Sequence, residues 1–449
     1  MNLKNELVKK VCWKYPHTIA EVASNNRWKP YDYLVYASKI IARRIFLGNA
    51  RIIVLMPPRH GKSELISHWT PFWFLHHFPD RKIILGSYSD AIAKQWGALV
   101  KQEIEDNEMS ELKVAEDTAA KSDWKIRGRL GSMTTCGIGG AITSKGGNLL
   151  ILDDTVKNWE EASSPTIQER NVDWYKSTFY TRAEPNANIV VLGTPWHPND
   201  LLGYLRNNST ENWLIVQFPA LDENGKALCP DRFDTSALEI KKKEIGSFFF
   251  QALYLLNPSF PEGNLVKREN FKRYSTCPDC DRMFMAADLT YKKTDTGSYC
   301  VIHVWGILNN EFYLIEEFRA RVGFNDQCKE LRRLYFAFPK VREIYIEDAA
   351  SAQSVIDTLK TEVKGIHAVH VDSDKISRFL AVSPIIENRQ VNIPEGKMGD
   401  EYIDELCFFP KSKHNDRVDA TSVGFSKIQL RDTIANIPVA EKKSLFRNF

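Results

Sequence analysis

Short aliphatic runs alternate with longer helical patterns over residues 51–195, and this alternation restricts the fold more than any other feature of the sequence. Strands are expected at 51–56, 81–89, 148–154 and 187–195, with helices following the first two. The runs are apolar at successive positions, which is typical of strands buried on both faces of a parallel sheet. The sequence therefore predicts an α/β fold with a mainly parallel sheet flanked by helices.

A second series of strands begins after a segment rich in Pro, Gly and Asn at 247–266, which has the composition of a linker. Strands are expected at 282–291, 298–308, 309–320 and 341–349, followed by helices. The second and third of these strands meet at an Asn-Asn pair, which favours a hairpin. The pattern predicts a separate α/β unit in the second half.

Length and composition limit the classes of protein that remain. A chain of 449 residues is too long for one ordinary core, so two or three domains are expected. The net charge is only +3, so a nucleic-acid partner would require a local basic surface. No run of about eighteen apolar residues is present, so no membrane span is expected.

The eight cysteines are scattered, which suits free thiols in a reducing compartment. Cys277 and Cys280 have the spacing of a zinc knuckle, and only Cys300 and His303 are placed to complete such a site. Two unpaired thiols are the favoured interpretation of Cys277 and Cys280.

The segment Leu55–Glu64, LMPPRHGKSE, lies between the first strand and a helix, as a phosphate-binding loop requires. Met56 stands where the usual pattern has its first glycine, but Gly61, Lys62 and Ser63 are intact. Lys62 is expected to neutralise the phosphates and Ser63 to ligate Mg²⁺. The residues expected to surround a bound ATP are Pro58, Arg59, His60, Gly61, Lys62, Ser63 and Glu64.

An acidic pair ends the strand NLLILDD. Asp153 is expected to hold Mg²⁺ beside the phosphates, and Asp154 to orient the attacking water. Thr194, after the strand at 187–195, is a candidate γ-phosphate sensor. Arg59 is the first candidate for the positive charge that stabilises the transition state. Arg127, Arg129 and Lys145 are the alternatives to Arg59.

Acidic residues also end or interrupt the apolar elements of the second half. These are Asp288, Asp295, Glu347, Asp416 and Asp419. A carboxylate on a buried strand is costly unless a cation compensates its charge. The ordered set of a strand Asp, a strand Glu and a helix Asp favours a Mg²⁺ or Mn²⁺ site. Two such cations about four ångströms apart can clamp the oxygens of a phosphodiester, which predicts metal-dependent nuclease chemistry.

Taken together, the two halves resemble the large subunit of bacteriophage terminase, the motor that packages viral DNA. The resemblance covers roughly residues 25–428. It depends on the order and spacing of the motifs PPRHGKSE, LLILDD, VLGTPWHPNDL, AADLT, YIEDAAS and HNDRVDA. Several members of this family also lack the first glycine of the phosphate loop, in agreement with Met56.

The resemblance implies an N-terminal P-loop ATPase that drives translocation and a C-terminal RNase H-like nuclease. It also implies specific roles: Lys62 and Ser63 bind phosphate and metal, Asp153 is the Mg²⁺ acid, Asp154 takes the place of a glutamate, and Thr194 belongs to a motif coupling hydrolysis to movement. Asp288, Glu347 and Asp416 match the nuclease acids. Asp295 and Asp419 are possible supplementary ligands, and the choice between Asp416 and Asp419 stays open.

The expected domains are a helical segment at 1–48, an ATPase domain at 49–256, a linker at 257–280, a nuclease domain at 281–430 and a tail at 431–449. The partners implied by the resemblance are double-stranded viral DNA, a portal protein, a terminase small subunit and further copies of the chain in a ring. The implied location is the cytoplasm of the host cell, with transient docking on the procapsid.

Two other functions compete with this one. A helicase-type or repair-type ATPase with an accessory nuclease would need a second helicase-like sheet, and the sequence contains no pattern for one. A DNA-binding assembly protein with an inactive nuclease fold would cut no DNA with Mn²⁺.

Overall fold

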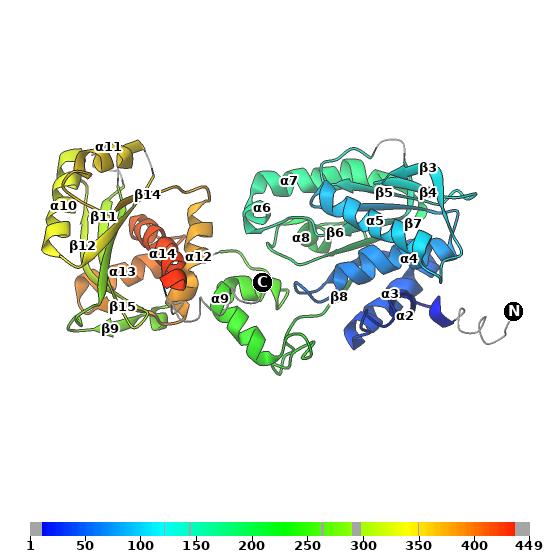
Figure 1. Ribbon diagram of the computed structural model, residues 1–449, viewed down its shortest axis with the longest axis horizontal. Coiled ribbons are helices and arrows are strands. Elements are labelled where there is room, and N and C mark those ends of the chain that lie inside the picture. Colours follow the sequence, from blue (N-terminus) through cyan, green and yellow to red (C-terminus); the bar gives the residue numbers. More distant parts are fainter. Residues whose placement is uncertain are drawn as a thin grey trace, which may run out of the picture. The chain divides into compact units, whose positions relative to one another are not determined.

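The computed structural model describes residues 11–120, 122–142, 145–261, 265–289, 298–348 and 350–435. The chain forms two compact units (Figure 1). The first contains Met1–Lys241 and Phe249–Phe260, and the second contains Lys242–Phe248 and Pro261–Phe449.

The first unit is built on an eight-stranded sheet in the order β3-β4-β5-β2-β6-β7-β1-β8. The strands are β1 (Arg51–Leu55), β2 (Lys82–Ser87), β3 (Val114–Ala120), β4 (Asp123–Ile126), β5 (Ser132–Gly137), β6 (Gly147–Asp153), β7 (Ala183–Gly193) and β8 (Leu214–Gln217). The α-helices are α2 (Pro16–Ala23), α3 (Asp32–Leu47), α4 (Thr70–His77), α5 (Asp90–Asp106), α6 (Trp159–Ser163), α7 (Pro165–Trp174), α8 (Leu201–Asn207) and α9 (Thr235–Leu253), the last interrupted at Gly246 (φ 78°). Short helical turns are η1 (Glu64–Trp69), η2 (Tyr175–Phe179) and η3 (Tyr180–Arg182).

The predicted parallel arrangement is confirmed from β5 through β8, where every pairing is parallel. Alternate residues of the strands enter two different cores. Ile52 and Val54 pack with α2, α3, α4 and α5 on one face of the sheet, whereas Ile53 and Leu55 pack with α7 and α8 on the other. Burial on both faces explains why the strands are continuously apolar. The two antiparallel strands β3 and β4 at one edge were not expected from the sequence.

The second unit contains a seven-stranded sheet in the order β14-β13-β10-β11-β12-β15-β9. The strands are β9 (Lys272–Tyr274), β10 (Arg282–Asp288), β11 (Cys300–Leu308), β12 (Glu311–Ala320), β13 (Val341–Glu347), β14 (Ile366–Val369) and β15 (Val391–Pro394). The helical elements are η4 (Arg268–Asn270), α10 (Phe324–Ala337), α11 (Ala350–Leu359), α12 (Lys375–Glu387), α13 (Lys397–Phe408) and α14 (Asp416–Ala435).

In this sheet, β10, β11 and β12 are antiparallel neighbours, while β13 and β14 run parallel to β10 on its other side. Asn309 (φ 51°) and Asn310 (φ 59°) make the turn between β11 and β12, which confirms the predicted hairpin. Both residues adopt the left-handed conformation that a two-residue hairpin turn requires. Helices α12, α13 and α14 cover one face of the sheet, and α10 and α11 cover the other.

Two stretches of the chain lie differently from the expected domain boundaries. Lys242–Phe248, within the range expected for the ATPase domain, belongs to the second unit. Residues 257–280 were expected to be a linker, yet β9 lies within this range and pairs with β15 at the edge of the second sheet. The strand is only three residues long, so its sequence pattern is too short to stand out. The tail at 431–449 is described only as far as residue 435, where α14 ends.

Two further expectations can be compared with the structure. No helix among the described residues is long and apolar enough to cross a membrane. Cys300 and His303 cannot complete one zinc site with Cys277 and Cys280, because they lie on opposite faces of β11. The thiol of Cys300 is in the core beneath α10 and α11, whereas His303 contacts Tyr402 of α13.

Candidate active sites

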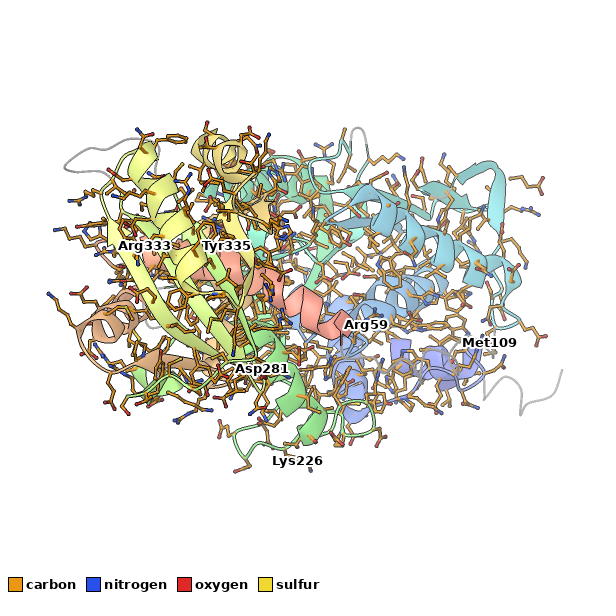
Figure 2. All side chains as sticks on the ribbon, turned by 60° about the vertical axis from the view of Figure 1, so that its left-hand side comes forward. Arg59, Met109, Lys226, Asp281, Arg333 and Tyr335 are labelled. Carbon is orange, nitrogen blue, oxygen red and sulfur yellow. The ribbon has the colours of Figure 1, made fainter. Side chains whose placement is uncertain are left out.

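The phosphate loop connects the carboxyl end of β1 to η1, at the edge of the sheet where a nucleotide site is expected. Gly61 adopts φ 87°, a conformation that favours glycine, and a Cβ there would lie 3.1 Å from a methyl carbon of Leu34. Arg59 also has a positive φ, 63°, and its side chain is exposed (Figure 2). Met56, in place of the first glycine, is fully buried in the core.

The order of the strands places the acidic pair beside this loop. Strand β7 lies between β1 and β6, so the carboxyl ends of all three strands meet at one edge of the sheet. Asp153 is 2% exposed, and its two oxygens accept hydrogen bonds from two serines. Ser63 donates to Oδ1 at 2.9 Å and Ser67 donates to Oδ2 at 2.7 Å.

Burial and the neighbouring charge of Asp154 raise the pKa of Asp153 to about 7, against the lowering effects of Lys62 and the two serines. Further positive charge at this carboxyl would lower its pKa and favour the ionised form. The contact between Ser63 and Asp153 joins the two groups that the sequence predicted as Mg²⁺ ligands. Their oxygens are of the kind that Mg²⁺ prefers, so the residues present fit a magnesium ion.

Asp154 is the second acid of the pair and has a strained backbone conformation with φ 45°. Its Oδ2 lies 3.3 Å from Nζ of Lys62, so the loop lysine is paired with this carboxylate. A bound phosphate would compete with Asp154 for Lys62. The structure therefore brings Lys62, Ser63, Asp153 and Asp154 together.

The other predicted residues of this site lie around that group. Thr194 is buried and donates to the carbonyl oxygen of Met56 at 3.0 Å, which joins the end of β7 to the start of the loop. The ring of His60 is buried against Phe233, so its side chain faces the protein interior. Glu64 accepts a hydrogen bond from His68 at 2.9 Å.

The alternatives to Arg59 are engaged elsewhere. Arg127 pairs with Glu116, Arg129 lies 3.8 Å from Asp80, and Lys145 lies 2.6 Å from Asp123. All three pairs lie at or near strands β3 to β5, which form one side of the sheet. Strand β1 and its loop lie near the opposite side, next to β8.

The acids of the second unit converge from three elements. Asp288 ends β10, Glu347 ends the parallel neighbour β13, and Asp416 and Asp419 lie in the first turn of α14, which packs against β10. The pKa of Asp288 is raised well above its ordinary value by burial and by the charges of Asp419, Glu347 and Asp416. Strongly mutual effects of this kind require the four carboxyl groups to be close. Asp295 lies outside the described residues.

Two basic side chains of α12 occupy part of this acidic centre. Arg378 donates to Glu347 Oε2 at 2.8 Å and to Asp419 Oδ1 at 2.9 Å. Lys375 donates to Asp419 Oδ2 at 2.5 Å and to Asn415 Oδ1 at 2.9 Å. In the described part of the chain, no three His, Cys, Asp or Glu side chains are grouped so that they could hold a metal ion.

Asp416 has a different environment from Asp419. It is 3% exposed, its Oδ1 accepts from the backbone N–H of Tyr299 at 3.2 Å, and its Oδ2 is buried without a hydrogen-bond partner among the described residues. A buried carboxylate oxygen without a donor is costly, and a divalent cation would satisfy it. The donor chemistry of Asp288, Glu347 and Asp416 therefore fits Mg²⁺ or Mn²⁺.

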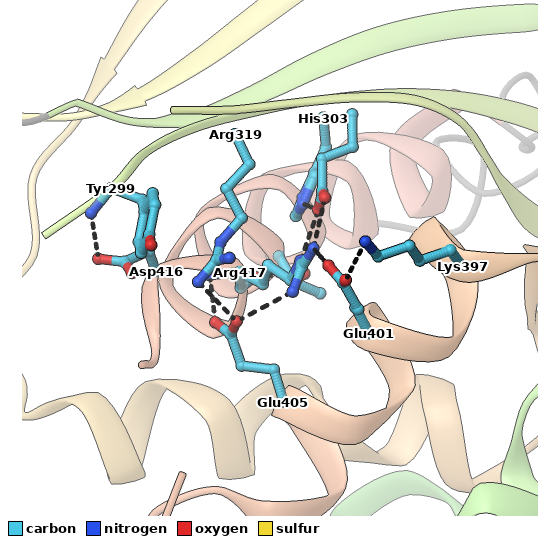
Figure 3. Close-up of polar contacts among 10 residues, drawn as sticks. Tyr299, His303, Arg319, Lys397, Glu401, Glu405, Asp416 and Arg417 are labelled. Carbon is cyan, nitrogen blue, oxygen red and sulfur yellow. Dashed lines mark hydrogen bonds and ion pairs between the residues drawn. The ribbon is translucent and has the colours of Figure 1, made fainter. Parts of the chain in front are cut away.

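The residue after Asp416 fixes the start of α14 (Figure 3). Arg417 is 4% exposed and donates to both oxygens of Glu317 at 2.8 and 2.7 Å. It also contacts Glu401 at 3.1 Å and Glu405 at 3.4 Å, both on α13. These ion pairs hold the first turn of α14 against β12 and α13. They lower the pKa of Glu317 to about 2, against the opposing effect of burial.

Sequence reasoning missed three residues at these sites: Ser67, Lys375 and Arg378. Ser67 follows Ser63 by four positions on a helical segment, and this spacing places both hydroxyls on one face. That signal was available in the sequence. Lys375 and Arg378 are more than twenty residues away from each of the four acids in the sequence. They meet the acids only in the folded chain, so no local sequence pattern connects them.

Comparisons with known proteins agree with this architecture. A family model described as the terminase RNase H-like domain matches residues 285–427. The large terminase of the thermophilic bacteriophage D6E, solved with ADP, is similar over 86% of this chain and 95% of its own, with 14% identity and a TM-score of 0.51. This chain has the fold of a phage large terminase.

A second crystal form of the D6E large terminase is similar over 89% of this chain and all of its own length, with 13% identity and a TM-score of 0.51. A comparison with proteins of curated function finds no match. The resemblance to terminase large subunits and the predicted fold class are confirmed. The second unit of this terminase fold is the RNase H-like domain, with Asp288, Glu347, Asp416 and Asp419 inside the matched region.

Proposed function

We propose that this chain is the motor and nuclease subunit of a viral DNA-packaging machine. ATP hydrolysis in the first unit drives double-stranded DNA into a procapsid, and the second unit cuts the concatemer. The observation that supports this most directly is the presence of two separate acidic centres in one terminase fold. One is the Asp153 group beside a phosphate loop, and the other is the Asp288 group between a sheet and α14.

In the ATPase site, the backbone N–H groups of residues 58–64 would bind the phosphates of ATP, and Lys62 would exchange Asp154 for a phosphate oxygen. Ser63 and Asp153 would hold Mg²⁺, which neutralises charge that develops on the phosphates. Release of Asp154 from Lys62 frees a carboxylate that can orient a water molecule. Thr194 would couple a movement of the loop to β7 through its hydrogen bond to the carbonyl oxygen of Met56.

In the nuclease site, Asp288, Glu347 and Asp416 would hold Mg²⁺ or Mn²⁺, which activates water and stabilises charge on the phosphodiester. The ion pairs of Arg417 keep Asp416 at a fixed place relative to β10. This restricts motion of the ligand and supports a preorganised site. Asp295, beyond the described residues, is the remaining candidate for a supplementary ligand, whereas both oxygens of Asp419 are paired with Lys375 and Arg378.

The expected partners follow from this role. They are double-stranded viral DNA, the portal protein, a terminase small subunit and further copies of the chain in a ring. The expected location is the host cytoplasm, with transient docking on the procapsid.

The experiment that tests the proposal separates the two activities in the full chain. Lys62→Ala should abolish ATP hydrolysis and keep Mn²⁺-dependent nicking of plasmid DNA, whereas Asp288→Ala should do the opposite. The exposed residues Lys82 and Asp281 supply matched controls, Lys82→Ala and Asp281→Ala. Nicking that survives Asp288→Ala, or a wild-type chain that never nicks DNA, would instead favour an assembly protein with an inactive nuclease fold.

A further inference from the structure

The basic residues of α12 carry an inference about the nuclease centre that deepens the proposed function and depends on it. Asp374 caps the start of helix α12, and its Oδ1 accepts from the N–H groups of Ile376 and Ser377 at 2.9 and 3.1 Å. This cap fixes the first turn of the helix. Lys375 and Arg378 are three positions apart on that turn, so both side chains reach the same side of the helix.

Asp419 is the residue on which these two bases converge. Its side chain is 4% exposed, and each of its oxygens already accepts from a positive group. A divalent cation bound to Asp419 would lie beside both positive charges and would be repelled by them. Asp416, by contrast, offers a buried oxygen to which no described residue donates a hydrogen bond. Asp419 therefore acts as the counter-ion of Lys375 and Arg378 rather than as a metal ligand.

The two bases differ in how far they are accessible. The side chain of Arg378 is 12% exposed and is enclosed between Glu347 and Asp419, and its Nε is buried without a partner in the described part of the chain. The side chain of Lys375 is 47% exposed, and its charge acts on Asp288, where it opposes the rise of that pKa. Arg378 can thus orient a carboxylate, while Lys375 can reach a substrate.

We propose that Lys375 contacts a backbone phosphate of the DNA at the cutting site and that Arg378 positions Glu347 for metal binding. Asp419 holds both basic side chains in place. The four carboxylates and two bases leave a net charge of −2 when all are ionised, so the centre still attracts divalent cations. The phosphate would be recognised as part of the sugar–phosphate backbone, without reading of sequence.

The first test concerns Lys375. In the full chain, Lys375→Met should raise the KM for DNA in Mn²⁺-dependent nicking without lowering Mn²⁺ affinity. DNA binding in Ca²⁺ should lose about one unit of its salt-dependence slope, because one phosphate contact is removed. The control is Lys360→Met, since Lys360 is exposed and pairs only with Asp357 at 3.1 Å among the contacts described. An unchanged slope in Lys375→Met would overturn the assignment of Lys375.

The second test concerns Arg378. Arg378→Lys keeps the charge but cannot bridge two carboxylates as a guanidinium does. Mn²⁺ affinity can be measured from the electron paramagnetic resonance signal of free Mn²⁺. It should fall about tenfold, as for other groups that orient a metal ligand. The matched control is Arg333→Lys, since Arg333 lies on α10 with a side chain 52% exposed (Figure 2). A lower melting temperature with unchanged Mn²⁺ affinity would show a purely structural role and refute the proposal.

The design separates this inference from the proposed function. A wild-type chain that does not nick DNA would refute the nuclease activity, while the salt slope and Mn²⁺ affinity would still decide the roles of Lys375 and Arg378. A wild-type chain that nicks DNA, with both variants indistinguishable from their controls, would refute the inference alone.

Discussion

Ser67 offers the sharpest test of the electrostatics in the ATPase site. It is fully buried, and its hydroxyl is the only described donor to Oδ2 of Asp153. Ser67→Ala would leave this oxygen without a donor. A hydrogen bond to a charged group contributes about 1.5–3 kcal/mol. Because 1.36 kcal/mol corresponds to one pKa unit, the pKa of Asp153 should rise by about one to two units.

Mg²⁺ would bind to the ionised form of Asp153, so a higher pKa of this carboxyl should lower activity near neutral pH. The pKa of Asp153 is already raised to about 7, so the wild-type carboxyl is about three-quarters ionised at pH 7.5. In Ser67→Ala, the ionised fraction at that pH should fall to about one quarter or less. The kcat/KM for ATP hydrolysis should drop about threefold or more at pH 7.5 and recover at higher pH, since kcat/KM reports the free enzyme.

The assay is the pH dependence of kcat/KM between pH 6 and 9.5, with Ser87→Ala as the control. Ser87 is also buried and lies opposite Asp153 in the register of β2 and β6, but its hydroxyl has no described hydrogen-bond partner. Its replacement should leave the acidic limb of the profile in place. A uniform loss of activity at every pH in Ser67→Ala, or an unmoved limb, would show that Ser67 does not control the charge of Asp153.

Two further predictions concern the second unit. Asp288→Asn should raise the melting temperature of the metal-free protein in EDTA, and more at pH 8 than at pH 5. The pKa of Asp288 is raised by burial and by neighbouring carboxylates, so its ionisation costs stability as pH rises; an equal change at both pH values would contradict this. Arg417→Met should destabilise the second unit by about 3–5 kcal/mol in urea, because Glu317 would stay buried without its main partner. Arg332→Met, which breaks an exposed pair with Glu362, should cost much less stability, and equal costs would refute the argument.

Local pattern was sufficient for several elements of the fold. The continuous apolar runs predicted the central parallel strands, because strands buried on both faces need no polar side. The Asn309–Asn310 pair predicted its hairpin, because both residues tolerate the left-handed conformation. The strand β9 was not predicted, since its three residues carry no measurable periodicity.

The sequence determined which residues are candidates for the chemistry: a loop with Gly61, Lys62 and Ser63, and acids at strand ends in both halves. Only the tertiary structure decided which groups these candidates contact. Because β7 lies between β1 and β6 in the sheet, Ser63 reaches Asp153. Because α12 packs against α14, Asp419 is paired with two basic side chains, whereas Oδ2 of Asp416 has no hydrogen-bond partner among the described residues. The physical reason is that residue types and local patterns are present in the sequence itself. Burial and charge partners depend on distant segments that come together only after folding.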